Sequence, residues 1–193
     1  MNKRLIILAS ESPRRRELLA LTGLKFRVVP SDYEEDMTKP LSPHKLAKFL
    51  SREKARSVAT GYSNAIVIAA DTFILFNGKL LGKPHTLKEA INMLDLLNGR
   101  SHTVITGYTI IDTAENTSLS RSVRTKVWLR DLADEEIYTY VESGEPLDKA
   151  GAYAIQGLGS ILIKKIVGDY FNVIGLPLCS LAEDLKKFGI FIL

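Results

Sequence analysis

The sequence predicts an α/β fold in which helices flank a mixed, twisted β-sheet. Short apolar runs that are typical of strands alternate with amphipathic segments that are typical of helices along the 193 residues. The most apolar run, 65–70, is continuous, as expected of a central strand that is buried on both faces. Asn77-Gly78 is a strong hairpin signal, which adds antiparallel pairing to the sheet. The length favours a single domain over residues 1–193.

The N-terminal part of the chain is expected to begin with a strand at Leu5–Leu8. Ser12-Pro13 fits the N-cap and the first turn of a helix. A second strand is expected at Phe26–Val29, followed by an acidic loop at 31–36. Ser42-Pro43 then opens a longer amphipathic helix.

The central strand is expected to end at Asp71, with a hairpin over 73–81 after it. Thr86 and Glu89 form a capping box, which predicts a helix that runs to Asn98.

The C-terminal half is expected to start with a second hairpin and to end on a helix. The predicted elements are strands at 102–112 and 120–129, a helix at 134–143, a strand at 161–167 and an amphipathic helix at 178–188.

The composition, 46% hydrophobic and 25% charged, is that of an ordinary globular protein. The net charge of +4 is compatible with an anionic ligand, but no nucleic-acid-binding motif accompanies it, so nucleic acid is not an expected partner. No apolar stretch approaches the length of a transmembrane helix, so no membrane is expected either. Cys179 is the only cysteine and lies in an apolar segment, which favours a buried thiol and a cytoplasmic protein.

The junction between the first strand and the first helix gathers groups that bind anions. Ser10 and Ser12 precede three consecutive arginines, Arg14, Arg15 and Arg16. Free N–H groups and the helix dipole favour negative charge there, and guanidinium groups match phosphate oxygens. The local pattern is equally consistent with an ordinary N-cap followed by a solvated basic turn.

This run, Ser-x-Ser-Pro-Arg-Arg after an N-terminal strand, resembles the Maf family of nucleoside triphosphate pyrophosphatases. The resemblance continues in the family's order over nearly the whole chain, through Glu34-Glu35, Arg52-Glu53-Lys54-Ala55, Ala70-Asp71-Thr72, Gly82-Lys83-Pro84, 145–153, Ile155-Gln156-Gly157 and Gly175-Leu176-Pro177-Leu178. It implies two lobes around a deep groove. It also implies an enzyme that cleaves a nucleoside triphosphate into monophosphate and pyrophosphate, with Mg²⁺ or Mn²⁺ as cofactor.

Asp71 is the catalytic residue that the resemblance implies. The carboxyl end of an apolar strand is where α/β sheets place ligands, although a capping Asp is the simpler interpretation of the position alone. A carboxylate there can hold a divalent cation or accept a proton from water, and both roles stay open. The resemblance implies that Glu35 is the second metal ligand, with Glu34 as the neighbour that a one-residue shift would select.

The resemblance implies five residues for binding the phosphates: Ser10, Arg14, Arg15, Lys54 and Lys83. By pattern Lys54 lies on the exposed side of its helix and Lys83 in a Gly-Lys-Pro loop, and either alone would be a surface lysine. Together with the arginines they balance the charge of a triphosphate.

Arg14, Thr72 and Gln156 match the subgroup of the family that prefers dTTP and UTP. Uracil and thymine share an acceptor–donor–acceptor edge that a glutamine amide can read. Alternatively, Gln156 braces its own glycine-rich loop by bonding to the backbone. Two other functions stay open, a pyrophosphatase for methylated GTP and a non-enzymatic regulator of cell division that binds nucleic acid. The residues also leave the choice between a monomer and a homodimer open.

Overall fold

The computed structural model describes residues 4–193, which form two compact units. Unit 1 consists of 4–71, Thr106–Val123 and Gly175–Leu193. Unit 2 consists of Thr72–Ile105 and Arg124–Ile174. Within the described residues no helix combines the length and the apolar composition that a bilayer span requires.

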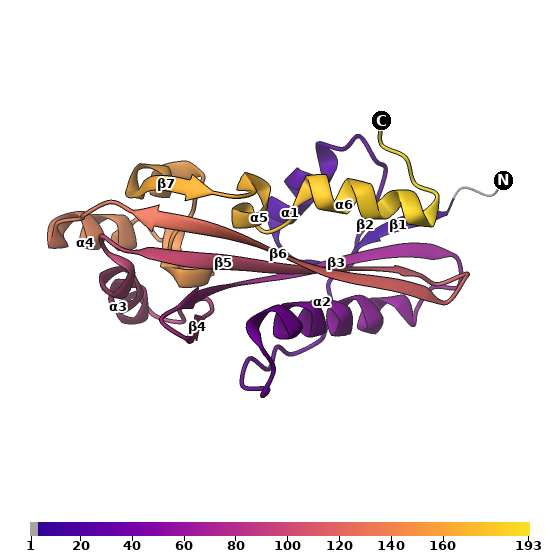
Figure 1. The fold of residues 1–193 in the computed structure, drawn as a ribbon, viewed down its shortest axis with the longest axis horizontal. Helices are drawn as coiled ribbons and strands as arrows, with labels where there is room; N and C mark the ends of the chain where they lie inside the picture. Colours follow the sequence, from indigo (N-terminus) through magenta and orange to yellow (C-terminus); the bar gives the residue numbers. More distant parts are fainter. Residues whose placement is uncertain (1–3) are drawn as a thin grey trace. The chain divides into compact units, whose positions relative to one another are not determined.

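The strands of the described chain form a mixed sheet in the order β2-β1-β3-β5-β6-β7, with β4 paired to β3 (Figure 1). Their bounds are β1 Leu5–Leu8, β2 Arg27–Val28, β3 Ala65–Phe76, β4 Lys79–Leu81, β5 Ser101–Asp112, β6 Thr117–Leu129 and β7 Ile163–Val167. Strand β1 is parallel to β2 and β3, whereas β4 runs antiparallel to β3 and β7 to β6. The predicted mixed α/β sheet is thereby confirmed.

Six α-helices are described, with the bounds α1 Pro13–Ala20, α2 Pro43–Ala59, α3 Leu87–Leu97, α4 Asp134–Glu142, α5 Tyr170–Ile174 and α6 Leu178–Leu185. Four short 3₁₀ helices complete the described chain, η1 Glu145–Asp148, η2 Ala150–Ala152, η3 Gly157–Leu162 and η4 Lys186–Phe188. The sequence pattern does not predict α5, η1, η2 or η3, because each is too short to show a hydrophobic period.

In unit 1, α2 packs on one face of β1 and β3, and α1 and α6 cover the opposite face (Figure 1). Ala55 and Val58 of α2 are buried against Ile7 and Val67. Because successive side chains of a strand point to opposite faces, the neighbouring Ile68 is buried on the other side. The strands are therefore apolar at every position, as the run 65–70 predicts.

Unit 2 has a core of its own, built from α3, α4, the 3₁₀ segments and its share of the strands. Its buried members include Ile74, Leu94, Leu97, Val127, Ile137, Tyr140 and Tyr153.

Strand β3 is longer than the sequence predicts. It runs through Asp71 without a break and ends at Phe76, so Asp71 lies inside a strand and the prediction of a strand end there is wrong. The residues that follow Asp71 are a β-branched residue and an aromatic, which favour an extended backbone. The hairpin turn itself is confirmed, with Asn77 and Gly78 at φ 47° and 78°, as a type I′ turn requires.

Some other elements are shorter than predicted. Strand β2 covers only Arg27–Val28, β7 begins at Ile163, and α6 gives way to a 3₁₀ turn after Leu185. Cys179 is exposed, so the prediction of a buried thiol is wrong. It lies well away from the face of α6 on which Leu181 is buried.

Candidate functional site

The β1–α1 junction uses both of its hydroxyls to fix the local backbone. Ser12 is the N-cap of α1, and its Oγ accepts a hydrogen bond from the Arg15 backbone N–H at 3.4 Å. The Oγ of the buried Ser10 accepts from the Ser12 N–H at 3.2 Å. A hydroxyl that accepts in this way keeps its O–H donor for a ligand.

Arg15 is held at the start of α1 by a distant backbone group. Its Nε donates to the carbonyl oxygen of Gly175 at 2.9 Å. Burial lowers the pKa of Arg15, the carboxylates of Asp71 and Glu35 act in the opposite direction, and the positive charge of Arg14 adds to the lowering. The net pKa of Arg15 therefore falls below its ordinary value, and its guanidinium lies close enough to Asp71, Glu35 and Arg14 to be affected by their charges.

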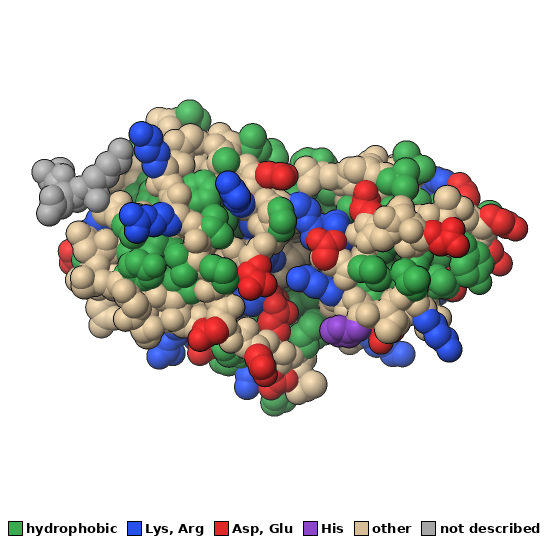
Figure 2. All heavy atoms as spheres, turned by 180° about the vertical axis from the view of Figure 1, so that it is seen from behind, with side chains coloured by type: hydrophobic (Ala, Val, Ile, Leu, Met, Phe, Trp, Pro, Cys, Tyr) green, Lys and Arg blue, Asp and Glu red, His purple; other side chains and the backbone are tan. Residues whose placement is uncertain are grey.

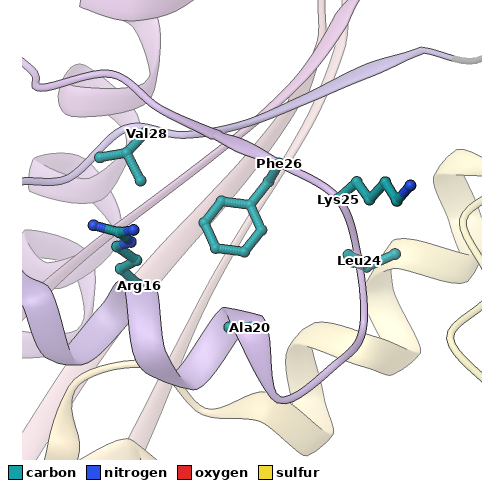
Figure 3. Close-up of a pocket in the computed structure, with 6 residues that line it drawn as sticks. All are labelled: Arg16, Ala20, Leu24, Lys25, Phe26 and Val28. Carbon is teal, nitrogen blue, oxygen red and sulfur yellow. The ribbon is translucent and has the colours of Figure 1, made fainter.

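Arg16, the third arginine of the run, lines two pockets. One is also lined by Ser10 and Ser12 of the β1–α1 junction. The other lies between α1 and the segment that leads into β2, where the ring of Phe26 lies near the middle (Figure 3). This second pocket is lined by Arg16, Ala20, Leu24, Lys25, Phe26 and Val28. The pattern of three adjacent arginines does not by itself distinguish this side chain from Arg14 and Arg15.

Lys54, near the middle of α2, joins two carboxylates. Its Nζ donates to Asp71 Oδ1 at 2.5 Å and to Glu35 Oε1. The Lys54 side chain is only 12% exposed and that of Asp71 5%, whereas Glu35 remains 41% exposed. The expectation that Lys54 lies on an exposed helix face is therefore wrong, because its side chain contacts Asp71 and Glu35. These two partners lie outside the helix, so helical periodicity does not predict the contact.

The acidic loop is fastened to α2 close to Lys54. The Ser31 and Ser57 hydroxyls are 2.9 Å apart, and the Tyr33 N–H donates to Ser31 Oγ at 3.2 Å. These contacts hold the loop so that Glu35 reaches the lysine. Sequence reasoning misses both serines, although Ser57 follows Lys54 by three residues and so lies on the same side of the helix.

Asp71 has the electrostatics of a proton acceptor. Burial has the largest effect and raises the pKa of Asp71. The positive charges of Lys54 and Arg15 lower this pKa, whereas the negative charge of Glu35 raises it. The net pKa lies above the ordinary value. A carboxylate with a raised pKa is a stronger base than one in water. The cluster of Arg15, Glu35, Lys54 and Asp71 thus combines a buried carboxylate with two cationic side chains.

The remaining predicted site residues belong to unit 2. Thr72 follows Asp71 in β3, and Lys83 is exposed in the loop after β4. Gln156 is half-buried just before η3, and its side-chain amide makes no hydrogen bond to any other residue in 4–193. The Gly151 N–H donates to Gly82 O at 2.9 Å, which links the segment 145–153 to the loop that carries Lys83.

Among solved structures, the chain resembles "The structure of the Staphylococcus aureus Ham1 protein" with a TM-score of 0.51 and 14% identity. The match covers 83% of this chain and 80% of the other, and it shows a shared fold.

Curated relatives are far more similar in sequence. A protein of Methanosarcina mazei named dTTP/UTP pyrophosphatase is 50% identical over 188 residues, which is 97% of this chain and 95% of that protein. A protein of Thermoanaerobacter sp. with the same name is 50% identical over 183 residues, 94% of this chain and 95% of its own. The family model described as Maf-like protein matches residues 5–188. The chain belongs to the Maf family.

Proposed function

We propose that the protein is a nucleoside triphosphate pyrophosphatase that hydrolyses dTTP and UTP to the monophosphate and pyrophosphate. The observation that carries the proposal is the Lys54 ammonium held between Glu35 and the buried Asp71, next to Arg15. The name of its relatives, at about half identity over nearly their full length, gives the substrates.

Positive side chains account for binding of the triphosphate. Arg14, Arg15 and Lys54 lie at or beside the cluster, and Ser10 offers an O–H donor at the start of the same junction. We assign Lys83 to the same task on the strength of the family resemblance. Phosphoryl transfer depends mainly on positioning and charge neutralisation, which these groups supply.

The carboxylates of Glu35 and Asp71 fit a hard divalent cation such as Mg²⁺ or Mn²⁺. One oxygen of each carboxylate contacts the same ammonium nitrogen, Lys54 Nζ, so the two carboxylates are already directed at a common positive charge. Mg²⁺ commonly takes one or two protein carboxylates and completes its shell with phosphate oxygens and water. When bound, the ion would withdraw charge from the phosphate oxygens.

Asp71 is assigned the proton transfer. Its raised pKa makes it able to accept a proton from the water that breaks the anhydride bond between the α- and β-phosphates. Arg15 and Lys54 face the negative charge that gathers on the departing pyrophosphate.

Arg14, Thr72 and Gln156 are assigned the choice of base. The free amide of Gln156 can donate and accept, which the uracil edge requires. We further propose one functional domain over residues 1–193, since the family model spans both units, and a cytoplasmic location, where nucleoside triphosphates are found.

A nucleotide panel tests the proposal. Purified protein with Mg²⁺ or Mn²⁺ is offered dTTP, UTP, CTP and N7-methyl-GTP, and pyrophosphate is measured. We expect the highest kcat/KM for dTTP and UTP, and no release after chelation of the metal. Better hydrolysis of methylated GTP would refute the specificity, and release of orthophosphate alone would refute the reaction.

A further inference from the structure

A single carboxylate organises the segment around Gln156. Glu145 Oε1 accepts hydrogen bonds from the Tyr140 hydroxyl and the Gly159 N–H, both at 2.9 Å. Glu145 Oε2 accepts from the Leu158 N–H at 3.0 Å. Both oxygens of this side chain are therefore occupied within unit 2.

Tyr140 extends the network to the other side of Gln156. Its hydroxyl donates to Glu145 and also accepts from the Ala154 N–H at 3.1 Å, and its side chain is buried. The pair thus binds backbone N–H groups two residues before Gln156 and two and three residues after it. Gln156 therefore lies between backbone groups that are hydrogen-bonded on both sides of it.

The carboxylate also lies at the start of η3, where negative charge is favourable. Burial raises the pKa of Glu145, but the N–H groups of Gly159 and Leu158 and the Tyr140 hydroxyl outweigh it and hold the pKa below its ordinary value. Gly157 has φ +68°, and a Cβ there would lie 2.6 Å from Glu145 Oε2. The positive φ favours glycine at this position, and any side chain there would also press on the carboxylate.

These contacts bear on what Gln156 does. A glutamine that braced its own loop would bond to the neighbouring backbone, yet the Gln156 amide makes no such bond to the described residues. The backbone groups are satisfied by Glu145 and Tyr140 instead. Glu145 and Tyr140 therefore hold the backbone of the loop, and the Gln156 amide is left available for another partner.

We propose that Glu145 and Tyr140 form a positioning pair that fixes the segment 154–159, so that the Gln156 amide is set to read the pyrimidine edge of the substrate. The inference rests on the proposed function and adds to it two residues that determine specificity indirectly. Neither residue touches the reacting phosphates in this scheme.

Glu145→Gln is the first test. The amide keeps one acceptor oxygen but turns an NH₂ toward an N–H donor of the backbone, so one end of the segment is released. A misplaced reading group costs on the order of tenfold or more in discrimination. We expect the ratio of kcat/KM for UTP to that for CTP to fall about tenfold, mainly through a higher KM for UTP. Glu142→Gln, at an exposed position three residues earlier, is the matched control and should leave the ratio unchanged.

Tyr140→Phe is the second variant, with the exposed Tyr138→Phe as its control. It removes one donor and one acceptor while keeping the ring, so it tests the pair even if Glu145→Gln does not fold. Amide hydrogen exchange at Ala154, Leu158 and Gly159 gives a readout that needs no substrate, and we expect faster exchange in both variants.

The outcomes separate the two proposals. If the wild-type protein hydrolyses UTP but the folded variants keep its UTP-to-CTP ratio, the positioning role is refuted and the proposed function stands. Unchanged amide exchange at Ala154, Leu158 and Gly159 in the variants also refutes the positioning role. If the wild-type protein releases no pyrophosphate from UTP, the proposed function fails, while the exchange data still decide whether the pair holds the segment.

Discussion

Asp71 is a charged residue inside a strand, with only 5% of its side chain exposed. A buried carboxylate without partners is strongly disfavoured, so Lys54 and Arg15 are what keep it usable as an anion. Glu35 opposes them, because two carboxylates close together raise each other's pKa. The residue is therefore poised between charge and neutrality, which suits a group that takes up a proton or holds a cation.

Asp71→Asn is expected to reduce pyrophosphate release by about a thousandfold, because the amide can neither accept the proton nor bind a metal ion. The amide oxygen can still accept a hydrogen bond from Lys54, and Lys54 retains its ion pair with Glu35. The melting temperature should therefore change little. Pyrophosphate assays and thermal melts check both points. Asp32→Asn in the exposed part of the acidic loop is the control. A folded Asp71→Asn protein with near wild-type turnover would leave the carboxylate a structural role only.

A second residue, His102, links stability to pH. The ring is buried, and its Nε2 lies 2.6 Å from the Tyr153 hydroxyl. Burial lowers the pKa of His102 to about 4. In the unfolded chain the ordinary pKa is about 6.5, so as the pH falls from about 6.5 to about 4 the unfolded chain binds a proton that the folded one does not. Stability from this residue is present above that window and is lost on acidification.

The pH prediction is measured by urea unfolding at pH 7 and pH 4.5. The wild-type protein should lose about 2 kcal/mol more than His102→Gln between these values. His85→Gln, at an exposed loop position, should behave as the wild type does. Superimposable pH profiles for wild type and His102→Gln would show that the buried ring does not resist protonation.

Helix α2 is the element on which the cluster of Arg15, Glu35, Lys54 and Asp71 depends. It carries Lys54 and lies very close to β5, where a Cβ on Gly107 would come within 2.1 Å of the Ala47 carbonyl oxygen. Ser51 adds a hydrogen bond of 2.9 Å to Thr109 in the same strand. The depth at which the helix lies on the sheet, and hence the reach of Lys54, is set by these contacts.

Gly107→Ala should therefore push α2 outward. We expect a loss of about 2–3 kcal/mol in unfolding free energy, since backbone cannot yield as a flexible side chain does. Turnover should fall as well, because Lys54 is two helical turns from Ala47. Urea unfolding and pyrophosphate assays measure the two effects. Gly61→Ala is the control, since its Cβ would meet only an ordinary contact at 3.6 Å. Equal stability of the two variants would contradict the close approach.

Helix α2 also shows where sequence reasoning succeeds and fails. Ser42-Pro43 and the spacing of apolar residues predict a helix, and it begins at Pro43. The same pattern places Lys54 in solvent, because periodicity reports only which face is apolar. The partners Glu35 and Asp71 come from a loop and a strand, so their meeting is a tertiary fact. Likewise no local signal marks Glu145, whose donors lie in α4 and η3.

The molecule carries a net charge of +4. On the face shown in Figure 2, both basic and acidic side chains are exposed. Under the proposed function, the phosphate groups of the nucleotide would be bound by the local cluster around Lys54 and not by the surface as a whole.

The candidate residues divide between the two units according to task. Unit 1 contains Ser10, Arg14, Arg15, Glu35, Lys54 and Asp71, and unit 2 contains Thr72, Lys83 and Gln156. Most groups that would act on phosphates thus belong to one unit, and two of the three that would choose the base belong to the other.

This division predicts two distinct kinetic patterns. Asp71→Asn should lower turnover of every nucleotide by the same factor, because the anhydride is common to all of them.

Gln156→Glu should lower kcat/KM for dTTP and UTP by about ten- to a hundredfold and leave poor substrates such as CTP less affected, because a carboxylate cannot donate to a uracil carbonyl. The nucleotide panel measures both variants side by side, with thermal melts to confirm folding. An equal loss for all nucleotides in Gln156→Glu would mean that this residue does not choose the base.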